Sequence, residues 1–287
     1  MSICRVDDFY KELKQYNTLK EIRACTIKEL QYLNNACGTI SSLKKYLSIY
    51  RSYLKDHIGD RKVSKRRLVE VLLKILVLSK EQSDEYSEEY TQSVALKNHN
   101  QRKVYDIESY LDTAKSLLYA NSYYDRIIAL CVLTGRRSAE IGCTASFEPV
   151  VDEGYLLFSG QLKTKNRGVM PAYLIPVFAN YHDLQQCLNS IRRDKPELIN
   201  NPTKFNKSVS KEIGIRVKKH LGEYVEGTVR IKDLRAIYAA LAYENYLYSC
   251  SNDFATISHN AFFSKILGHN EKDLNTCNSD GDCCIRK

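Results

Sequence analysis

Only 5 prolines and 12 glycines interrupt the 287 residues of this chain, and this scarcity limits the fold more than any other feature. An all-β protein needs many tight turns, and glycine and proline are the residues that form them most readily. Hydrophobic residues make up 44% of the chain and charged residues 27%, so a sizeable core can be buried. The composition therefore favours a mainly helical globular protein with one large domain or two smaller ones.

The chain divides by pattern into two parts. Apolar residues recur at intervals of three and four through most of the first hundred residues, which predicts helices there. A change from basic to acidic residues indicates a surface connection near residues 81–104. We therefore expect a helical N-terminal domain with its linker at residues 1–103, and a second domain at residues 104–287.

The second domain contains the most strand-like segments of the chain, at residues 154–164 and 169–178. Both are rich in Tyr, Leu, Phe and Val, and the sequence KNRG between them suits a hairpin turn. The segments on either side have helical periodicity. The expected fold class is therefore mainly α with a small antiparallel β-sheet (α+β).

The formal net charge of +9 has two interpretations. Lys and Arg displace counterions from phosphate, so the partner could be a nucleic acid, but a basic surface can also simply be solvated. Residues 61–67 hold five cations directly before an apolar helix. We expect these cations to contact a DNA backbone, with a solvated interdomain face as the alternative; they are Arg61, Lys62, Lys65, Arg66 and Arg67.

The cysteines and the hydropathy pattern bear on location. None of the ten cysteines shows zinc-ligand spacing, and no signal peptide precedes them, so we expect reduced, mostly buried thiols. No apolar run approaches the 18 residues of a membrane span. These features predict an intracellular protein, cytoplasmic or associated with a nucleoid, or in a host cell compartment if the source is viral, with no membrane segment.

Two short motifs lie in the first half of the second domain. The sequence LTGRRSAEI, at residues 133–141, ends one helix with a glycine, continues with arginine and starts a new helix. This arrangement can aim a guanidinium at a phosphate beside the N-terminal amides of the new helix. The sequence GQLKTK, at residues 160–165, places Lys163 on the hairpin. Taken singly, an arginine near a helix cap and a lysine on a turn are usually solvated.

Two further motifs follow. In KDLRAIY, at residues 232–238, Lys232 and Arg235 are three residues apart and are expected to share one helical face, opposite an inward stripe that includes Leu234. In KILGH, at residues 265–269, a glycine closes a helix and His269 comes next. Taken singly, the first of these motifs could be a solvated basic face, and the second could hold an ordinary surface histidine.

Together the four motifs resemble the tyrosine recombinases, which use an arginine, a hairpin lysine, a His- or Lys-x-x-Arg pair and a Leu-Gly-His in this order. The form KDLRA, together with TGRR and the strand ending IPVF, is more similar to the telomere resolvases (protelomerases) of phages, viruses and linear replicons. The resemblance covers residues 120–276, whereas the N-terminal hundred residues match only in being helical and basic. It implies a helical, core-binding-like N-terminal domain and a tyrosine-recombinase-like catalytic domain.

The resemblance assigns a role to each motif. Arg137 and Arg235 would clamp the scissile phosphate and stabilise the pentacoordinate transition state. Lys163 would protonate the leaving 5′ oxygen as general acid. Lys232 stands where many relatives have a histidine, and His269 would hydrogen-bond a phosphate oxygen. No metal or other cofactor is expected, because side chains supply the cations.

The same resemblance names the partner. It implies double-stranded DNA, at a palindromic telomere or recombination site, bound by a dimer. Lys165 and Arg167 in the hairpin turn are expected to contact this DNA along with the cations at residues 61–67.

The nucleophile departs from the family pattern. A tyrosine is expected shortly after the Leu-Gly-His, but Asn278 and Asp280 stand at the expected positions, and the last tyrosine of the sequence is Tyr248. The resemblance stops after Ser279. A truncation, a frameshift or a degenerate descendant would each produce this, and the tyrosine would have to come from a longer C-terminus or a partner subunit.

Three functions remain open on the sequence. The first is a telomere resolvase, which cleaves DNA through a 3′-phosphotyrosyl link and rejoins the strands as hairpin ends. The second is a DNA-binding protein of the same fold that does not cut. The third is a site-specific integrase or invertase, which would share the catalytic residues but exchange strands between two duplexes.

Overall fold

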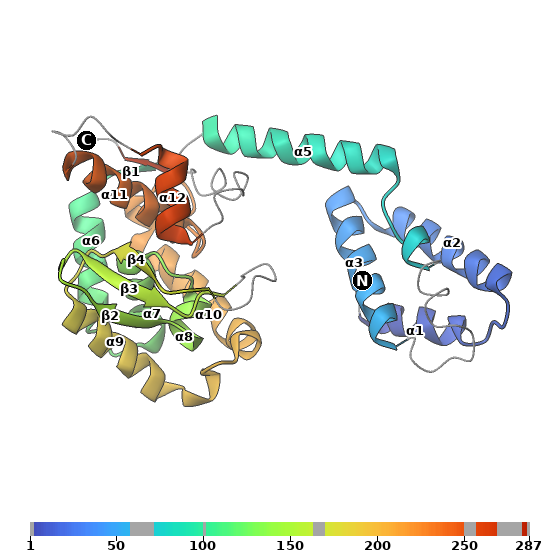
Figure 1. Ribbon diagram of the computed structural model, residues 1–287, viewed down its shortest axis with the longest axis horizontal. Coiled ribbons are helices and arrows are strands. Elements are labelled where there is room, and N and C mark those ends of the chain that lie inside the picture. The colour runs from blue at the N-terminus through green and yellow to red at the C-terminus, as the bar shows by residue number, and fades with distance from the viewer. Residues whose placement is uncertain are drawn as a thin grey trace. The chain divides into compact units, whose positions relative to one another are not determined.

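The computed structural model describes residues 3–57, 72–99, 102–162, 170–249, 257–268 and 283–285. The chain forms two compact units, residues 1–93 and 94–287 (Figure 1). The division falls inside helix α5 (Lys80–His99). The acidic stretch that we interpreted as a connection is therefore helical.

The N-terminal unit is built from α1 (Ile3–Leu13), α2 (Leu19–Ala36), α3 (Ile40–His57) and the first part of α5. Its helices pack through side chains repeated every three or four residues, and on α3 the buried ones are Leu43, Leu47, Tyr50 and Leu54.

One buried polar cluster joins the three helices. Glu29 of α2, only 3% exposed, accepts hydrogen bonds from Arg5 of α1 and from the Tyr50 hydroxyl of α3, the latter at 2.6 Å. A buried carboxylate is tolerated here because it is both paired and hydrogen-bonded.

The C-terminal unit is organised around helix α7 (Tyr123–Thr134). Every residue from Ile127 to Leu133 is at most 2% exposed, which places this helix at the centre of the core. Five helices pack around it: α6 (Ile107–Leu117), α8 (Ser138–Cys143), α9 (Tyr181–Asp194), α10 (Pro202–Leu221) and α11 (Asp233–Ser249). Two short 3-10 turns, Pro196–Leu198 and Gly222–Tyr224, follow α9 and α10.

A three-stranded antiparallel sheet lies beside these helices, in the order β2-β3-β4 (Figure 1). Its strands are β2 (Ser146–Pro149), β3 (Tyr155–Ser159) and β4 (Tyr173–Pro176). The predicted fold class, mainly α with a small antiparallel sheet, is confirmed. The sequence missed β2 because Phe147 is the one buried residue among its four, so there is no alternation to detect.

A second, smaller sheet was also missed. Strand β1 (Arg102–Val104) pairs in parallel with β5 (Cys283–Ile285) near the end of the sequence. Three-residue strands are too short for a periodic pattern. Val104 is 1% exposed and also bridges to Val225, so β1 is fixed to the core of the unit.

Helix α12 (His259–Leu267) is the last described helix, and it packs against α11 and β4. Within the described ranges, no helix combines the length and the hydropathy needed to cross a membrane. Five cysteines among the described side chains are free thiols, and all but the half-buried Cys37 are buried.

Candidate active site

The first motif forms the turn between α7 and α8. Helix α7 ends at Gly135, whose φ of 66° lies in the left-handed region. A Cβ atom here would lie 2.1 Å from a ring carbon of Tyr238, so only glycine fits. The two arginines that follow diverge: Arg136 is 1% exposed, whereas the Arg137 side chain is 27% exposed. The turn therefore leaves Arg137 accessible and buries its neighbour.

Glu140 holds the Arg137 side chain in place by hydrogen bonds. Its carboxylate accepts a hydrogen bond from the Arg137 guanidinium at 2.7 Å and another from the Arg137 backbone N–H at 2.9 Å. It also accepts the N–H of Leu162 at 3.2 Å, the residue directly before Lys163. Burial opposes ionisation, but Arg235, Arg137 and Arg136 together hold the pKa of the Glu140 carboxyl below its ordinary value. A charged carboxylate thus ties the arginine motif to the hairpin.

Arg235 joins the third motif to the first and the fourth. It projects from the first turn of α11, is 6% exposed, and donates to the carbonyl of Gly135 at 2.7 Å and to that of Leu267 at 2.6 Å. Gly135 is two residues before Arg137, so the Arg137 backbone lies within roughly 10 Å of the Arg235 guanidinium. The Arg137 side chain therefore starts from a point near Arg235, as it must if both arginines are to bind one phosphate.

Lys232 does not share a face with Arg235, contrary to the expectation from their spacing. Helix α11 begins at Asp233, so Lys232 precedes it and is exposed. Arg235 instead points into the interior to reach the two carbonyls, because main-chain oxygens of both neighbouring motifs converge there. The inward stripe that includes Leu234 is buried, as predicted.

Several predicted site residues lie outside the described residues. For the catalytic set, the structure reaches Leu162 and Gly268, the residues directly before Lys163 and His269. The predicted residues outside the described ranges are Lys163, His269, Asn278, Asp280, Arg61, Lys62, Lys65, Arg66, Arg67, Lys165 and Arg167.

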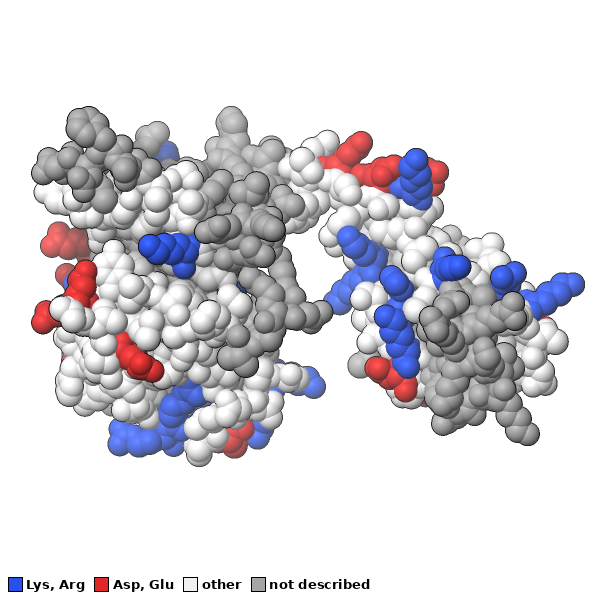
Figure 2. Space-filling view, in the orientation of Figure 1, with Lys and Arg blue, Asp and Glu red and all other residues white. Residues whose placement is uncertain are grey.

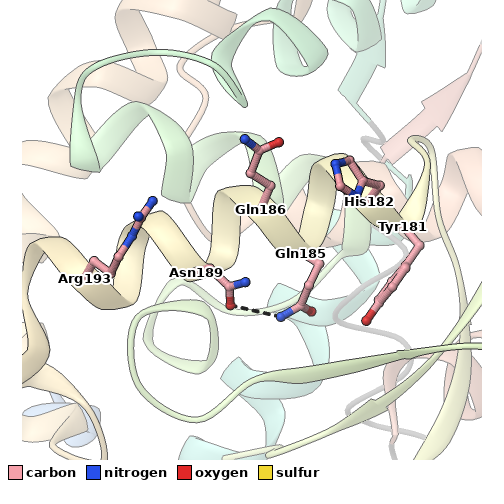
Figure 3. A pocket seen from close by; sticks show the side chains of 6 residues that line it. All are labelled: Tyr181, His182, Gln185, Gln186, Asn189 and Arg193. Carbon is pink, nitrogen blue, oxygen red and sulfur yellow. Dashed lines mark hydrogen bonds between the residues drawn. The ribbon is translucent and has the colours of Figure 1, made fainter.

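A surface pocket lies away from the motifs. It lies along one face of α9 and is lined by neutral amides, a tyrosine, a histidine and Arg193, with Gln185 donating to Asn189 at 3.0 Å (Figure 3). No residue of the four motifs lines it. Among the described side chains, no group of three or more His, Cys, Asp or Glu is placed to hold a metal. The described charged side chains of the motifs, Arg137, Glu140 and Arg235, lie outside this pocket.

Helix α10 carries a basic surface that sequence reasoning did not single out. Phe205, Val209, Ile213 and Val217 are buried on one side of it. Exposed lysines repeat on another side at intervals of three, four and seven residues, and we call them the lysine stripe: Lys204, Lys207, Lys211 and Lys218. Figure 2 shows basic side chains gathered over the α9 and α10 edge of this unit. The four-residue apolar repeat was the signal that could have revealed the stripe.

The C-terminal unit matches a known family. Residues 101–279, more than half of the chain, match the model of the telomere resolvase ResT/TelK catalytic domain. A comparison with curated protein sequences found no match.

Solved structures share the fold. Protelomerase TelA covalently complexed with substrate DNA has a TM-score of 0.82 and 22% identity, covering 98% of this chain and 88% of that one. An arginine-to-alanine variant of TelA complexed with DNA hairpin product gives a TM-score of 0.80 at 22% identity, with the same coverage. Protelomerase TelK complexed with substrate DNA gives 0.64 at 19% identity, covering 93% of this chain and 59% of that one.

Proposed function

This chain belongs to the telomere resolvase family, and we propose that it acts on duplex DNA as these enzymes do, breaking strands and rejoining them as covalently closed hairpin ends. The observation that carries the proposal is the pair of hydrogen bonds from Arg235 to Gly135 and Leu267. Through them, Arg235 meets one motif that lies 100 residues earlier in the chain and another that lies 32 residues later.

The two arginines bind and stabilise the reacting phosphate. Arg137 is oriented by a buried carboxylate and partly exposed, so its guanidinium can reach a phosphate from solvent. Arg235 adds a fixed positive charge from the interior side. Because both cations are held in place before the substrate arrives, they stabilise the charge that develops on the equatorial oxygens without reorganisation.

The remaining motif residues complete the proposed site. Lys163 acts as the general acid for the leaving 5′ oxygen, and its chain neighbour Leu162 is already bonded to the Glu140 carboxylate. His269 hydrogen-bonds a phosphate oxygen, and it follows Gly268 directly. The exposed Lys232 contributes positive charge at the edge of the site.

The nucleophile favours a second candidate function. Asn278 and Asp280 stand where a tyrosine is expected, and no tyrosine follows Tyr248 in this sequence. A phosphotyrosyl intermediate then requires a tyrosine from a partner subunit or from further residues. Without one, the same arginines still bind phosphate, and the protein binds its DNA site without cutting it.

We propose that the DNA interface has three parts. They are the lysine stripe of α10, the cations at residues 61–67, and Lys165 and Arg167 of the hairpin turn. A palindromic site has two-fold symmetry, which a protein dimer matches by placing one copy on each half. The partner is therefore a palindromic duplex bound by two copies of this chain.

A gel assay tests the proposal. The purified protein is incubated with a duplex carrying the palindromic telomere site of its replicon, and the products are separated under denaturing conditions. Hairpin product or covalent adduct that disappears with Arg137→Ala supports a resolvase. Arg137-dependent binding without adduct supports the non-cleaving function, and strand exchange between two duplexes would support an integrase instead.

A further inference from the structure

Three side chains form a continuous line of hydrogen bonds across the site, which we call the relay: Arg136, Tyr173 and Gln161. Arg136 donates to the hydroxyl of Tyr173 at 2.6 Å, and this hydroxyl donates to the side-chain carbonyl of Gln161 at 2.6 Å. The amide nitrogen of Gln161 donates to the carbonyl of Gly268 at 2.9 Å. The relay thus runs from the arginine turn through β4 and the hairpin to the end of α12.

Arg136 also closes the line into a ring. Its other terminal nitrogen donates to the carbonyl of Ile266 at 2.8 Å, two residues before Gly268, and its Nε donates to Thr134 at 3.0 Å. The end of α12 is therefore held at two points, once directly by Arg136 and once through the relay.

The surroundings of Gly268 show how closely the relay packs against its backbone. Its φ of 63° is left-handed, and a Cβ atom there would lie 2.1 Å from the Gln161 side-chain oxygen and 2.6 Å from the Tyr173 hydroxyl. Atoms at these separations overlap, so a larger residue would force the relay apart. The glycine of the Leu-Gly-His motif is needed for this contact as well as for ending the helix.

The burial of Arg136 indicates that it fixes the positions of its hydrogen-bond partners. Its side chain is 1% exposed, and its guanidinium carbon lies 4.8 Å from the centre of the Phe158 ring. Its three hydrogen bonds go to neutral oxygens. Burying a charge is costly, and a well-packed apolar side chain is often no less stable. A planar guanidinium does what an apolar chain cannot, because each of its nitrogens fixes the position of one oxygen.

We infer that Arg136, Tyr173 and Gln161 are positioning residues that hold three chain segments at fixed positions around the phosphate site. The inference rests on the proposed function. Arg136 directly precedes Arg137, Gln161 is two residues before Lys163, and Gly268 directly precedes His269. Removing the Tyr173 hydroxyl breaks the connection from Arg136 to Gln161, so the hairpin keeps only the bonds of Gln161 to Gly268 and of Leu162 to Glu140, while every proposed catalytic side chain stays in the protein.

The test compares two tyrosine variants of the full chain. Tyr173→Phe removes the middle link, and Tyr238→Phe removes a similar hydroxyl that donates to Pro176 at 2.7 Å outside the relay. Tyr173→Phe loses two hydrogen bonds, one accepted from Arg136 and one donated to Gln161, whereas Tyr238→Phe loses one, so thermal stability should fall more in Tyr173→Phe and the comparison is made on the site itself. Affinity for inorganic phosphate, followed by phosphorus NMR, should weaken about tenfold in Tyr173→Phe only. Hydrogen exchange of the Leu162 amide should accelerate about tenfold in that variant, with the amides of α7 unchanged.

A second pair covers the case in which Tyr173→Phe fails to fold. Gln161→Ala removes the last two bonds of the relay, from Tyr173 and to Gly268, and Gln185→Ala, which removes the bond to Asn189, is its control on α9. Equal phosphate affinity and equal Leu162 exchange in the relay variants and their controls would overturn the inference. Arg137→Ala separates this result from the proposed function: if it leaves phosphate binding unchanged, the phosphate site itself is wrong, and Leu162 exchange still decides whether the relay positions the hairpin.

Discussion

Removing the lysine stripe of α10 should make DNA binding much less sensitive to salt. The stripe runs from Lys204 to Lys218, about 21 Å along the helix at 1.5 Å per residue, which exceeds the roughly 12 Å width of a major groove. Its lysines can therefore reach phosphates on both sides of the groove. Each phosphate contact contributes about 0.9 to the slope of log affinity against log salt, so four Lys→Gln changes should lower the slope by up to about 3.6.

This change in slope is large enough to measure by fluorescence anisotropy on a labelled duplex. With slopes that differ by about 3.6, raising the salt from 50 to 200 mM should lower the affinity of the unmodified protein roughly 150-fold more than that of the fourfold variant. The matched control is Lys115→Gln, an exposed lysine of α6 that pairs with Asp112. Lys211→Gln alone should lower the slope by about 0.9 and the control by nothing. A fourfold variant with the slope of the unmodified protein would show that the stripe is only a solvated surface.

Four further predictions concern stability, charge and cleavage. Glu140→Gln should make the free energy of unfolding depend less on pH in the acid range. The lowered pKa of the Glu140 carboxyl stabilises the fold at pH values above the ordinary pKa of about 4.3, and this stabilisation is lost as the pH falls through the folded-state pKa. Denaturant unfolding between pH 7 and pH 3 should therefore show a smaller loss of stability in the variant. Gly135→Ala should destabilise the protein by about 2–5 kcal/mol, because the backbone is left-handed there and the new Cβ would overlap the Tyr238 ring. Gly214→Ala has nothing within 4 Å of its Cβ and should stabilise α10 by about 1 kcal/mol. Urea denaturation compares the two variants, and equal effects would contradict the geometry. Neutralising the three cations at residues 65–67 should lower the salt slope by about one unit per lost phosphate contact, and an unchanged slope would favour a solvated face. The 287-residue chain should bind its site without forming covalent adduct, and Asp280→Tyr should restore some adduct on a denaturing gel; adduct from the unmodified chain would refute this.

Local patterns in the sequence were enough to predict much of this protein. The scarcity of glycine and proline predicted a mainly helical fold, and the strand-rich segments around residues 154–178 predicted strands β3 and β4. The order of four short motifs indicated the family, which the match over residues 101–279 establishes. These features are readable because each is carried by neighbouring residues, through helical or strand periodicity and through residues that end helices.

Only the tertiary structure decided how the motifs meet. Arg136 and Arg137 are adjacent in the chain, yet one is buried in the relay and the other is accessible, and nothing local distinguishes them. Arg235 lies inside the protein because it bonds Gly135, which is 100 residues away, and Arg136 bonds Ile266, which is 130 residues away. Partners so distant leave no periodic trace in the sequence. Their positions are set by how helices α7, α11 and α12 pack, and that packing determines which charges converge on the site.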